Sequence, residues 1–258
     1  MGVLNVTPDS FSDGSRYLDP ARAVRRGREM EREGADLIDI GAESTRPGAP
    51  AVPAKEEMRR LLPVVERLAR QLAIPISVDT SKPEVAQAAI ERGAGMVNDV
   101  TGLRRPAMAR VVARAGIPVV VMHTRGTPRT MRRLAIYRRV VPEVIAELRR
   151  SVERGIAAGI PREMILVDPG LGFAKGAEES LALLKDLAAF KRMGYPVVVG
   201  PSRKSFIGHV LGAGPEDRLF GTAAAVALAV QGGADIVRVH DVAEMRQVAD
   251  LARAIACA

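Results

Sequence analysis

Polar side chains recur along this chain directly after short apolar runs of strand type. The acceptor-rich set is Asn5, Asp39, Asp79, Asn98 and Asp168, with His123 between the last two. The basic set consists of Arg46, in a proline-glycine turn, Lys204, just past the seventh apolar run, and Arg238 and His240, in the eighth. One such residue could simply cap a helix or brace a loop. A whole series is harder to explain that way, because a buried polar group costs roughly a few kcal/mol unless something satisfies it.

The two sets together suit a ligand that has a donor-rich planar head and an anionic tail. An aspartate that accepts two parallel N–H bonds complements a 2-aminopyrimidinone edge, and the basic side chains with Asn5 would hold a phosphate group. The segment ESTRPG (43–48) adds hydroxyls and Arg46, although such a segment is more often structural. GPSRKS (200–205) resembles a strand-to-helix turn whose backbone amides face a ligand.

Several common site motifs are absent from the sequence. The glycine spacing of 200–205 is wrong for a Walker loop, and no G-x-G-x-x-G follows the first apolar run. There is no His/Cys cluster and no H-E-x-x-H, so we expect no tight transition-metal site. A hard cation held by Asn5 and a diphosphate is compatible with the sequence.

A strand followed by a helix is predicted eight times along the chain. The strands are nearly continuous apolar runs, which indicates that both faces of the sheet are covered. We expect strands that end at Val6 and that span 36–41, 75–80, 95–100, 118–123, 164–169, 196–200 and 235–240. Expected helices include 20–33, 55–71, 141–158 and 178–189. This pattern predicts an α/β fold, a single-domain (β/α)8 TIM barrel over residues 1–258, with a doubly wound open sheet as the alternative.

Length and composition agree with one globular barrel. The 258 residues are 47% hydrophobic and 26% charged, and no apolar run approaches the roughly 20 residues that span a bilayer. The single cysteine, Cys257, excludes an internal disulfide framework. We therefore expect a cytoplasmic protein with no membrane partner.

The net charge of +8 raises the question of a nucleic-acid partner. However, the arginines follow helical patterns with acids between them, and aromatic residues make up only 3% of the chain, which leaves little for base stacking. We expect no nucleic-acid partner. The positive field instead favours small anionic substrates such as phosphate esters.

Seven segments, in order along the chain, closely resemble the dihydropteroate synthases. They are NVTPDSFSDG (5–14), ESTRPG (43–48), SVDTSKP (77–83), NDVTG (98–102), DPGLGF (168–173), GPSRKSFIG (200–208) and RVHD (238–241). The resemblance implies a transferase of folate biosynthesis. Its reaction condenses 6-hydroxymethyl-7,8-dihydropterin diphosphate with 4-aminobenzoate to give 7,8-dihydropteroate and pyrophosphate. It also implies Mg2+, a homodimer and sensitivity to sulfonamides.

The resemblance also implies roles for individual residues. The implied pterin ligands are Asp79, Asn98, Asp168 and Lys204, with Met122 and Phe173 as apolar walls. The implied diphosphate ligands are Asn5, Thr45, Arg238 and His240, and Asn5 would also contact the metal. The implied aminobenzoate ligands are Thr45, Arg46, Pro47, Ser202 and Lys204. The residues expected to act in catalysis are Asp79, Asp168, Lys204 and Arg46, while Asp39 is placed in a supporting position.

The family reaction is described as dissociative, so pyrophosphate leaves first and a pterin cation forms. Under that mechanism the carboxylates would stabilise the cation while Arg238, His240 and Mg2+ stabilise the leaving group. The first two loops would close to exclude water. Two further alternatives are a pterin-binding methyltransferase domain, which should lack ESTRPG and SRKS together, and a catalytically silent pterin-binding paralogue.

Overall fold

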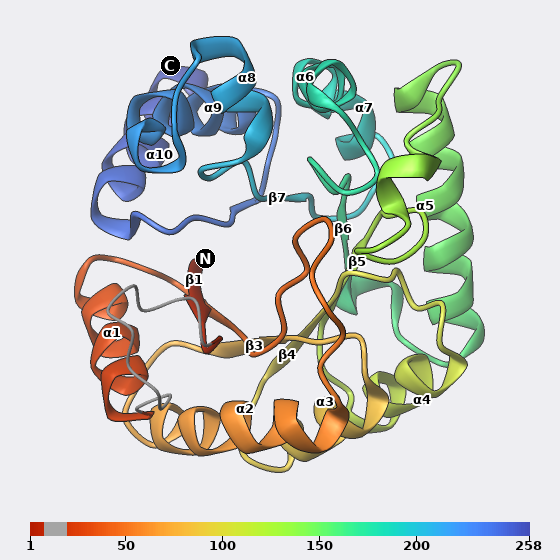
Figure 1. The fold of residues 1–258 in the computed structure, drawn as a ribbon, viewed down its shortest axis with the longest axis vertical. Coiled ribbons are helices and arrows are strands. Elements are labelled where there is room, and N and C mark those ends of the chain that lie inside the picture. Colours follow the sequence, from red (N-terminus) through yellow and green to blue (C-terminus); the bar gives the residue numbers. More distant parts are fainter. Residues whose placement is uncertain (8–19) are drawn as a thin grey trace.

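Eight short parallel strands alternate with helices in the computed structural model, which describes residues 1–7 and 20–258 (Figure 1). The strands are β1 (Gly2–Asn5), β2 (Ile38–Gly41), β3 (Ile76–Asp79), β4 (Met96–Asp99), β5 (Val119–Met122), β6 (Ile165–Asp168), β7 (Val198–Val199) and β8 (Ile236–Val237). The first expected loop, from residue 8 to 19, lies outside the described residues.

Helices lie outside the strands and cover them (Figure 1). The α-helices are α1 (Pro20–Arg32), α2 (Ala54–Ala69), α3 (Pro83–Ile90), α4 (Pro106–Ala115), α5 (Val140–Ala157), α6 (Ala177–Lys185), α7 (Leu187–Lys191), α8 (Ser205–Leu211), α9 (Leu219–Gln231) and α10 (Val242–Ala256). Three short 3-10 helices are η2 (Met131–Leu134), η3 (Arg162–Met164) and η4 (Pro215–Asp217). Proline occupies a first-turn position of α3 and α4, where its missing N–H is no loss.

The strands form a closed barrel. Strands β1 to β6 pair in sequence order, and β7 pairs with β8. Two isolated bridges join these sheets, Val167 with Val197 and Gly2 with Val239. Backbone hydrogen bonds accompany both bridges; for example, the Val3 N–H donates to the Val239 carbonyl at 2.9 Å. The predicted (β/α)8 barrel is confirmed, and the open-sheet alternative is wrong because the last strand returns to the first.

The predicted elements exist, with ends that differ by one or two residues at most of them and by more at two places. The last two strands contain only two residues each, because the barrel is completed there by single bridges rather than by long ladders. The helix expected at 178–189 is divided into α6 and α7 at Asp186, whose backbone ψ of 28° is not helical. Among the described helices, none is both long and apolar enough to cross a bilayer.

The alternation of side chains along β5 separates two apolar layers. Val120 faces the barrel interior, where it packs with Leu166 and Val198. Val119 and Val121 belong to the larger core between the barrel and the helices. Because side chains alternate along a strand, Met122 shares the interior face of Val120, and the next residue, His123, faces the helices.

Candidate active site

Acidic and amide side chains from β2, β3 and β4 meet inside the barrel, although Asp39 is the second residue of β2 and not its last. The strand register places Asp79 of β3 directly beside Asn98 of β4. The Asn98 side-chain amide donates to Oδ2 of Asp39 at 3.0 Å. Arg238, one residue beyond β8, donates from Nε to the same Asp39 oxygen at 2.7 Å and from Nη2 to Oδ2 of Asp79 at 3.1 Å. One cation therefore holds two carboxylates from different strands.

The charges in this cluster do not balance, because two buried carboxylates share one guanidinium. Burial, followed by repulsion from Asp39, raises the pKa of Asp79 to about 8. Burial opposes the charge of Arg238, but Asp39 and Asp79 nevertheless raise its pKa. At neutral pH the cluster therefore retains a proton that an added cation or hydrogen-bond donor could displace.

Buried acceptor atoms in the same cluster have no hydrogen-bond partner among the residues that the structure describes. They include Oδ1 of Asp79, Oδ1 of Asn98 and Oδ1 of Asp39, together with the nearby Ser77 hydroxyl. Unsatisfied buried polar atoms are rare in proteins because each loses its hydration without compensation. Their presence here indicates a surface that is complete only when a donor-rich ligand is bound.

Asp168 and Lys204 form the opposite side of the site. The Gly170 N–H donates to Oδ1 of Asp168 at 2.6 Å, and burial raises the pKa of Asp168 while the charge of Lys204 opposes that rise. The Lys204 ammonium donates to the Leu171 carbonyl and lies 5.0 Å from the centre of the Phe173 ring. Burial lowers the pKa of Lys204 to about 8. Met122 lies close by, since its Cγ is 3.3 Å from the point that a Cβ on Gly170 would occupy.

Ser202 and His240 lie together at the β7–β8 side of the barrel. The Ser202 hydroxyl is 3.0 Å from Nδ1 of His240 and accepts the His240 backbone N–H at 3.2 Å. Burial, followed by repulsion from Arg238, lowers the pKa of His240 to about 4. The sequence suggested a cation at this position, but the buried imidazole is neutral near pH 7. It can therefore offer a hydrogen bond but little charge.

The loop after β2 is anchored at its base and at its tip. Glu43 accepts the Val52 N–H at 2.8 Å and the Lys82 ammonium at 2.6 Å. At the tip, the Gly48 N–H donates to the Pro128 carbonyl at 2.8 Å, so this loop contacts the loop after β5. Between the anchors, Thr45 is half-buried and the side chains of Arg46 and Pro47 are exposed. Asn5, at the end of β1, is half-buried.

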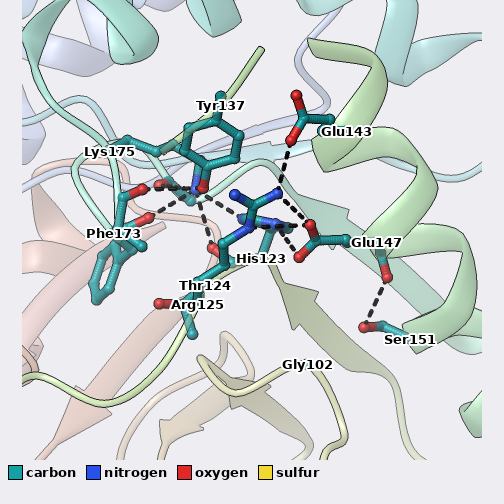
Figure 2. Close-up of polar contacts among 12 residues, drawn as sticks. Gly102, His123, Thr124, Arg125, Tyr137, Glu143, Glu147, Ser151, Phe173 and Lys175 are labelled. Atoms are coloured by element: carbon teal, nitrogen blue, oxygen red, sulfur yellow. Dashed lines mark hydrogen bonds and ion pairs between the residues drawn. The ribbon is translucent and has the colours of Figure 1, made fainter. Parts of the chain in front are cut away.

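Lys175, which no sequence motif indicated, lies buried at the back of the loop that follows Asp168 (residues 169–176, here the Asp168 loop; Figure 2). Its ammonium donates to the carbonyls of Phe173 at 2.8 Å and Gly170 at 3.0 Å and lies 2.8 Å from Nδ1 of His123. Burial lowers its pKa well below the usual value. Its position two residues after DPGLGF was the available signal, but lysine is seldom buried and nothing in the sequence indicated burial here.

His123 continues this network away from the barrel interior. Its Nε2 lies 3.1 Å from Oε2 of Glu147 on α5, and burial lowers its pKa to about 4. Since a carboxylate can only accept, the neutral ring carries its proton on Nε2, which leaves Nδ1 to accept from Lys175. Arg125 also binds Glu147 (Figure 2). His123 is therefore a support for the Asp168 loop, although the sequence grouped it with the strand-end site residues.

The fold and the site define a (β/α)8-barrel enzyme built to bind a flat, donor-rich ring next to an anionic group. Residues 1–240 match the family model described as pterin binding enzyme. A Synechocystis dihydropteroate synthase is 46% identical over 257 residues, which cover 99% of this chain and 89% of that protein.

Solved structures agree. A Xanthomonas albilineans dihydropteroate synthase with 4-aminobenzoic acid superposes with a TM-score of 0.94 at 46% identity, covering 100% of this chain and 92% of the other. A Yersinia pestis dihydropteroate synthase in complex with a sulfonamide drug has a TM-score of 0.95 at 40% identity, covering 100% of this chain and 94% of the other. The chain belongs to the pterin-binding enzymes and, within them, to the dihydropteroate synthases. It is a transferase that joins 6-hydroxymethyl-7,8-dihydropterin diphosphate to 4-aminobenzoate in folate biosynthesis.

Proposed function

We propose that the dihydropterin ring binds between the acidic cluster and Lys204. The observation that carries this proposal is the pair of unpartnered buried acceptors, Oδ1 of Asp79 and Oδ1 of Asn98. Together with Asp168, they offer the acceptors that an aminopyrimidinone edge requires. Met122 and Phe173 would contact the ring faces, and Lys204 already lies over the Phe173 ring.

The diphosphate would extend toward the β8 side of the site. Arg238 supplies the charge there, and His240 and Thr45 supply hydrogen bonds. Arg238 is bound to Asp39 and Asp79 without ligand. It would therefore have to share its donors between those carboxylates and the substrate. The planar guanidinium has five N–H donors, which makes such sharing feasible.

A Mg2+ ion fits the donors that the chain offers near this group. Among the described residues, no cluster of three His, Cys, Asp or Glu side chains could hold a metal ion by itself. The Asn5 carboxamide oxygen, at the end of β1, is a hard donor of the kind that Mg2+ accepts alongside phosphate oxygens and water. We therefore propose that Asn5 contacts a Mg2+ ion that arrives with the diphosphate. When bound, the ion would neutralise charge on the leaving group.

The 4-aminobenzoate would bind under the loop after β2. The exposed Arg46, with Thr45 and Pro47, would frame its carboxylate end, and Ser202 and Lys204 would border it from the other side. The position of this loop against the loop after β5 supports an enclosed binding space. Sulfonamides resemble aminobenzoate in shape, so we propose that they compete for the same place.

The charges favour a dissociative reaction. In the proposed binding mode, Asp79 and Asp168 would lie beside the pterin cation, and Arg238 would lie beside the leaving pyrophosphate. The aniline nitrogen is nucleophilic when neutral, so no strong base is required to activate it. Supporting this proposal, the imidazoles of His123 and His240 are both held in hydrogen bonds. Loop closure would exclude water from the cation.

A pyrophosphate-release assay with both substrates, each omitted in turn, tests the activity. We expect pyrophosphate release to require the pterin diphosphate. We also expect 4-aminobenzoate to drive the release to completion. A silent paralogue would bind pterin without release, and a methyltransferase domain would give no dihydropteroate. Either result would refute the proposal.

We also propose a homodimer formed through α8, α9 and α10, which lie together at one edge of the barrel (Figure 1). This edge carries exposed apolar side chains, and Phe220 is 86% exposed. The others are Val210, Leu211, Leu228, Leu251 and Ile255. A contiguous exposed apolar surface usually marks an interface. Sedimentation should show a dimer that Phe220→Asp shifts toward monomer, whereas Ile136→Asp, at another exposed apolar position, should not.

The free and exposed Cys257 leads us to propose a reducing, cytoplasmic location. Alkylation of Cys257 in intact cells would test this proposal, since a cysteine oxidised outside the cytoplasm would resist the reagent.

A further inference from the structure

A cavity of about 210 Å³ lies on the helix side of β5, between the turn before α4 and the helix α5. Three arginines line it, Arg104 from the turn and Arg150 and Arg154 from α5, together with the hydroxyls of Thr101 and Ser151. Of the residues assigned to the substrates, only Met122 borders this cavity. Figure 2 shows Ser151, one of the lining residues, beside Glu147 and below the His123 network.

None of the three guanidinium groups has a carboxylate partner among the described residues. Arg154 donates to the Gly102 carbonyl at 2.8 Å and to the Ser151 hydroxyl at 2.7 Å. Arg104 donates only to carbonyl oxygens, those of Thr124 and Gly126. The Arg150 side chain makes no ion pair or hydrogen bond with any residue in the described part of the chain. Some arginines elsewhere do pair with carboxylates, as Arg26 does with Glu33 and Arg59 with Glu56.

The nearby carboxylates are already occupied. Glu147 borders the cavity but accepts from Arg125, and its other oxygen meets His123. Asp99 accepts two hydrogen bonds from Thr101, through its N–H and its hydroxyl, and one from the Leu103 N–H. Three unpaired cations that face one small space repel one another. The pKa of Arg154 is lowered by burial and then by Arg104, with Arg150 adding to the effect.

We propose that this cavity is a second binding site, for a phosphate-class oxyanion, separate from the site of condensation. Guanidinium groups bind such anions through paired N–H donors, and the hydroxyls of Thr101 and Ser151 add further polar contacts. The cavity is smaller than pockets that hold drug-sized ligands, so it fits one phosphate group rather than a whole nucleotide. The anion is either free phosphate or the phosphate of a small monoester whose remainder extends into solvent.

Equilibrium dialysis with radiolabelled inorganic phosphate tests the site in the full-length enzyme. The variant is Arg150→Gln, and the matched control is Arg149→Gln, an exposed neighbour on α5 that does not line the cavity. Arg238→Gln is included because phosphate also binds where the diphosphate does. Two phosphates are expected on the wild-type enzyme and on Arg149→Gln. In Arg150→Gln, the affinity of the cavity for phosphate should fall by about tenfold or more, while the diphosphate position still binds. In Arg238→Gln, the diphosphate position should weaken and the cavity should still bind.

Arg154→Gln provides a second test. Circular dichroism confirms that this variant and Arg238→Gln are folded under the conditions of dialysis, since Arg154 also binds backbone carbonyls and Arg238 is the counter-ion of buried carboxylates. Arg150 has no such bonds, so its replacement should not disturb the fold. If Arg150→Gln and Arg154→Gln bind phosphate as the wild type does, or if Arg238→Gln abolishes all binding, the proposal is wrong. A parallel titration with phenyl phosphate separates the sources. If phenyl phosphate displaces labelled phosphate from the cavity, the site accepts monoesters. If it does not, the site is one for free phosphate. Turnover of Arg150→Gln should be unchanged, so this test is independent of the synthase activity.

Discussion

The guanidinium of Arg238 donates from Nε to Oδ2 of Asp39 at 2.7 Å, which links the end of the last strand to the second strand across the barrel. The same side chain reaches Asp79 on the third strand. A residue expected to bind the diphosphate is thus also the counter-ion of the acidic cluster. Under the proposed assignment, substrate binding and the internal charge balance of the barrel both depend on this one side chain.

Replacing Arg238 should destabilise the fold as well as impair activity. Arg238→Gln would leave Asp39 and Asp79 buried without a cation, and breaking a buried ion pair typically costs about 3–5 kcal/mol. Urea unfolding should show this loss in the free energy of unfolding. Arg67→Gln, at an exposed position on α2, should change it by less than about 0.5 kcal/mol. Equal midpoints for both variants would contradict the structural role of Arg238.

The stability of the enzyme should fall as the pH rises through the range in which Asp79 titrates. Its pKa is raised from an ordinary 3.8 to about 8 in the fold, so between these values the folded state holds a proton that the unfolded chain has released. For one such group, each unit of rise in pH across this range lowers the free energy of unfolding by up to about 1.4 kcal/mol. Urea unfolding at several pH values should show a smaller fall in Asp79→Asn. Parallel curves for the two proteins would count against the raised pKa.

Asp168→Asn should reduce turnover while the barrel remains folded. The substitution removes the negative charge that would accept from the pterin and stabilise its cation. A hydrogen bond to a charged group contributes about 1.5–3 kcal/mol, so a loss on the order of 100-fold in kcat/KM is expected. Circular dichroism provides the control for folding. Turnover at the wild-type rate would place the pterin elsewhere.

Arg46→Ala should weaken the use of 4-aminobenzoate and leave pterin binding nearly unchanged. Arg46 is exposed in the loop after β2 and forms no ion pair with the described residues, so its replacement should not affect stability. The expected result is a KM for 4-aminobenzoate raised about tenfold, corresponding to about 1.4 kcal/mol. Calorimetric titration with the pterin provides the comparison, and a loss of pterin affinity would show that Arg46 has been misplaced.

Lys175→Met should disturb the Asp168 loop from behind. The carbonyls of Gly170 and Phe173 would lose their buried donor, at a cost of about 1–3 kcal/mol. We expect a lower thermal midpoint and a raised KM for the pterin diphosphate, with the KM for 4-aminobenzoate less affected. Lys185→Met, near the end of α6, serves as the matched control. If both KM values rose equally, Lys175 would be a general support of the fold rather than a positioning residue for the pterin.

The sequence predicted the barrel because each strand is an apolar run and each polar residue follows one directly. That local order placed Asp79, Asn98 and Asp168 at strand ends, and the structure has them there. It could not show that β7 and β8 would be only two residues long, because their pairing partners come from distant strands. It also could not separate the helix-facing His123 from its interior neighbours, since that depends on which face of β5 packs inward.

The sequence by itself determined the fold class, the family and the residues at the carboxyl ends of the strands, because these follow from local patterns and from motifs of neighbouring residues. Only the tertiary structure decided which of these residues meet and what charge they carry. Arg238 lies 199 positions from Asp39 in the chain, yet the two are hydrogen-bonded. Burial and these long-range contacts set the protonation of Asp79, His240 and Lys175, since the pKa of a side chain depends on the charges and solvent around it.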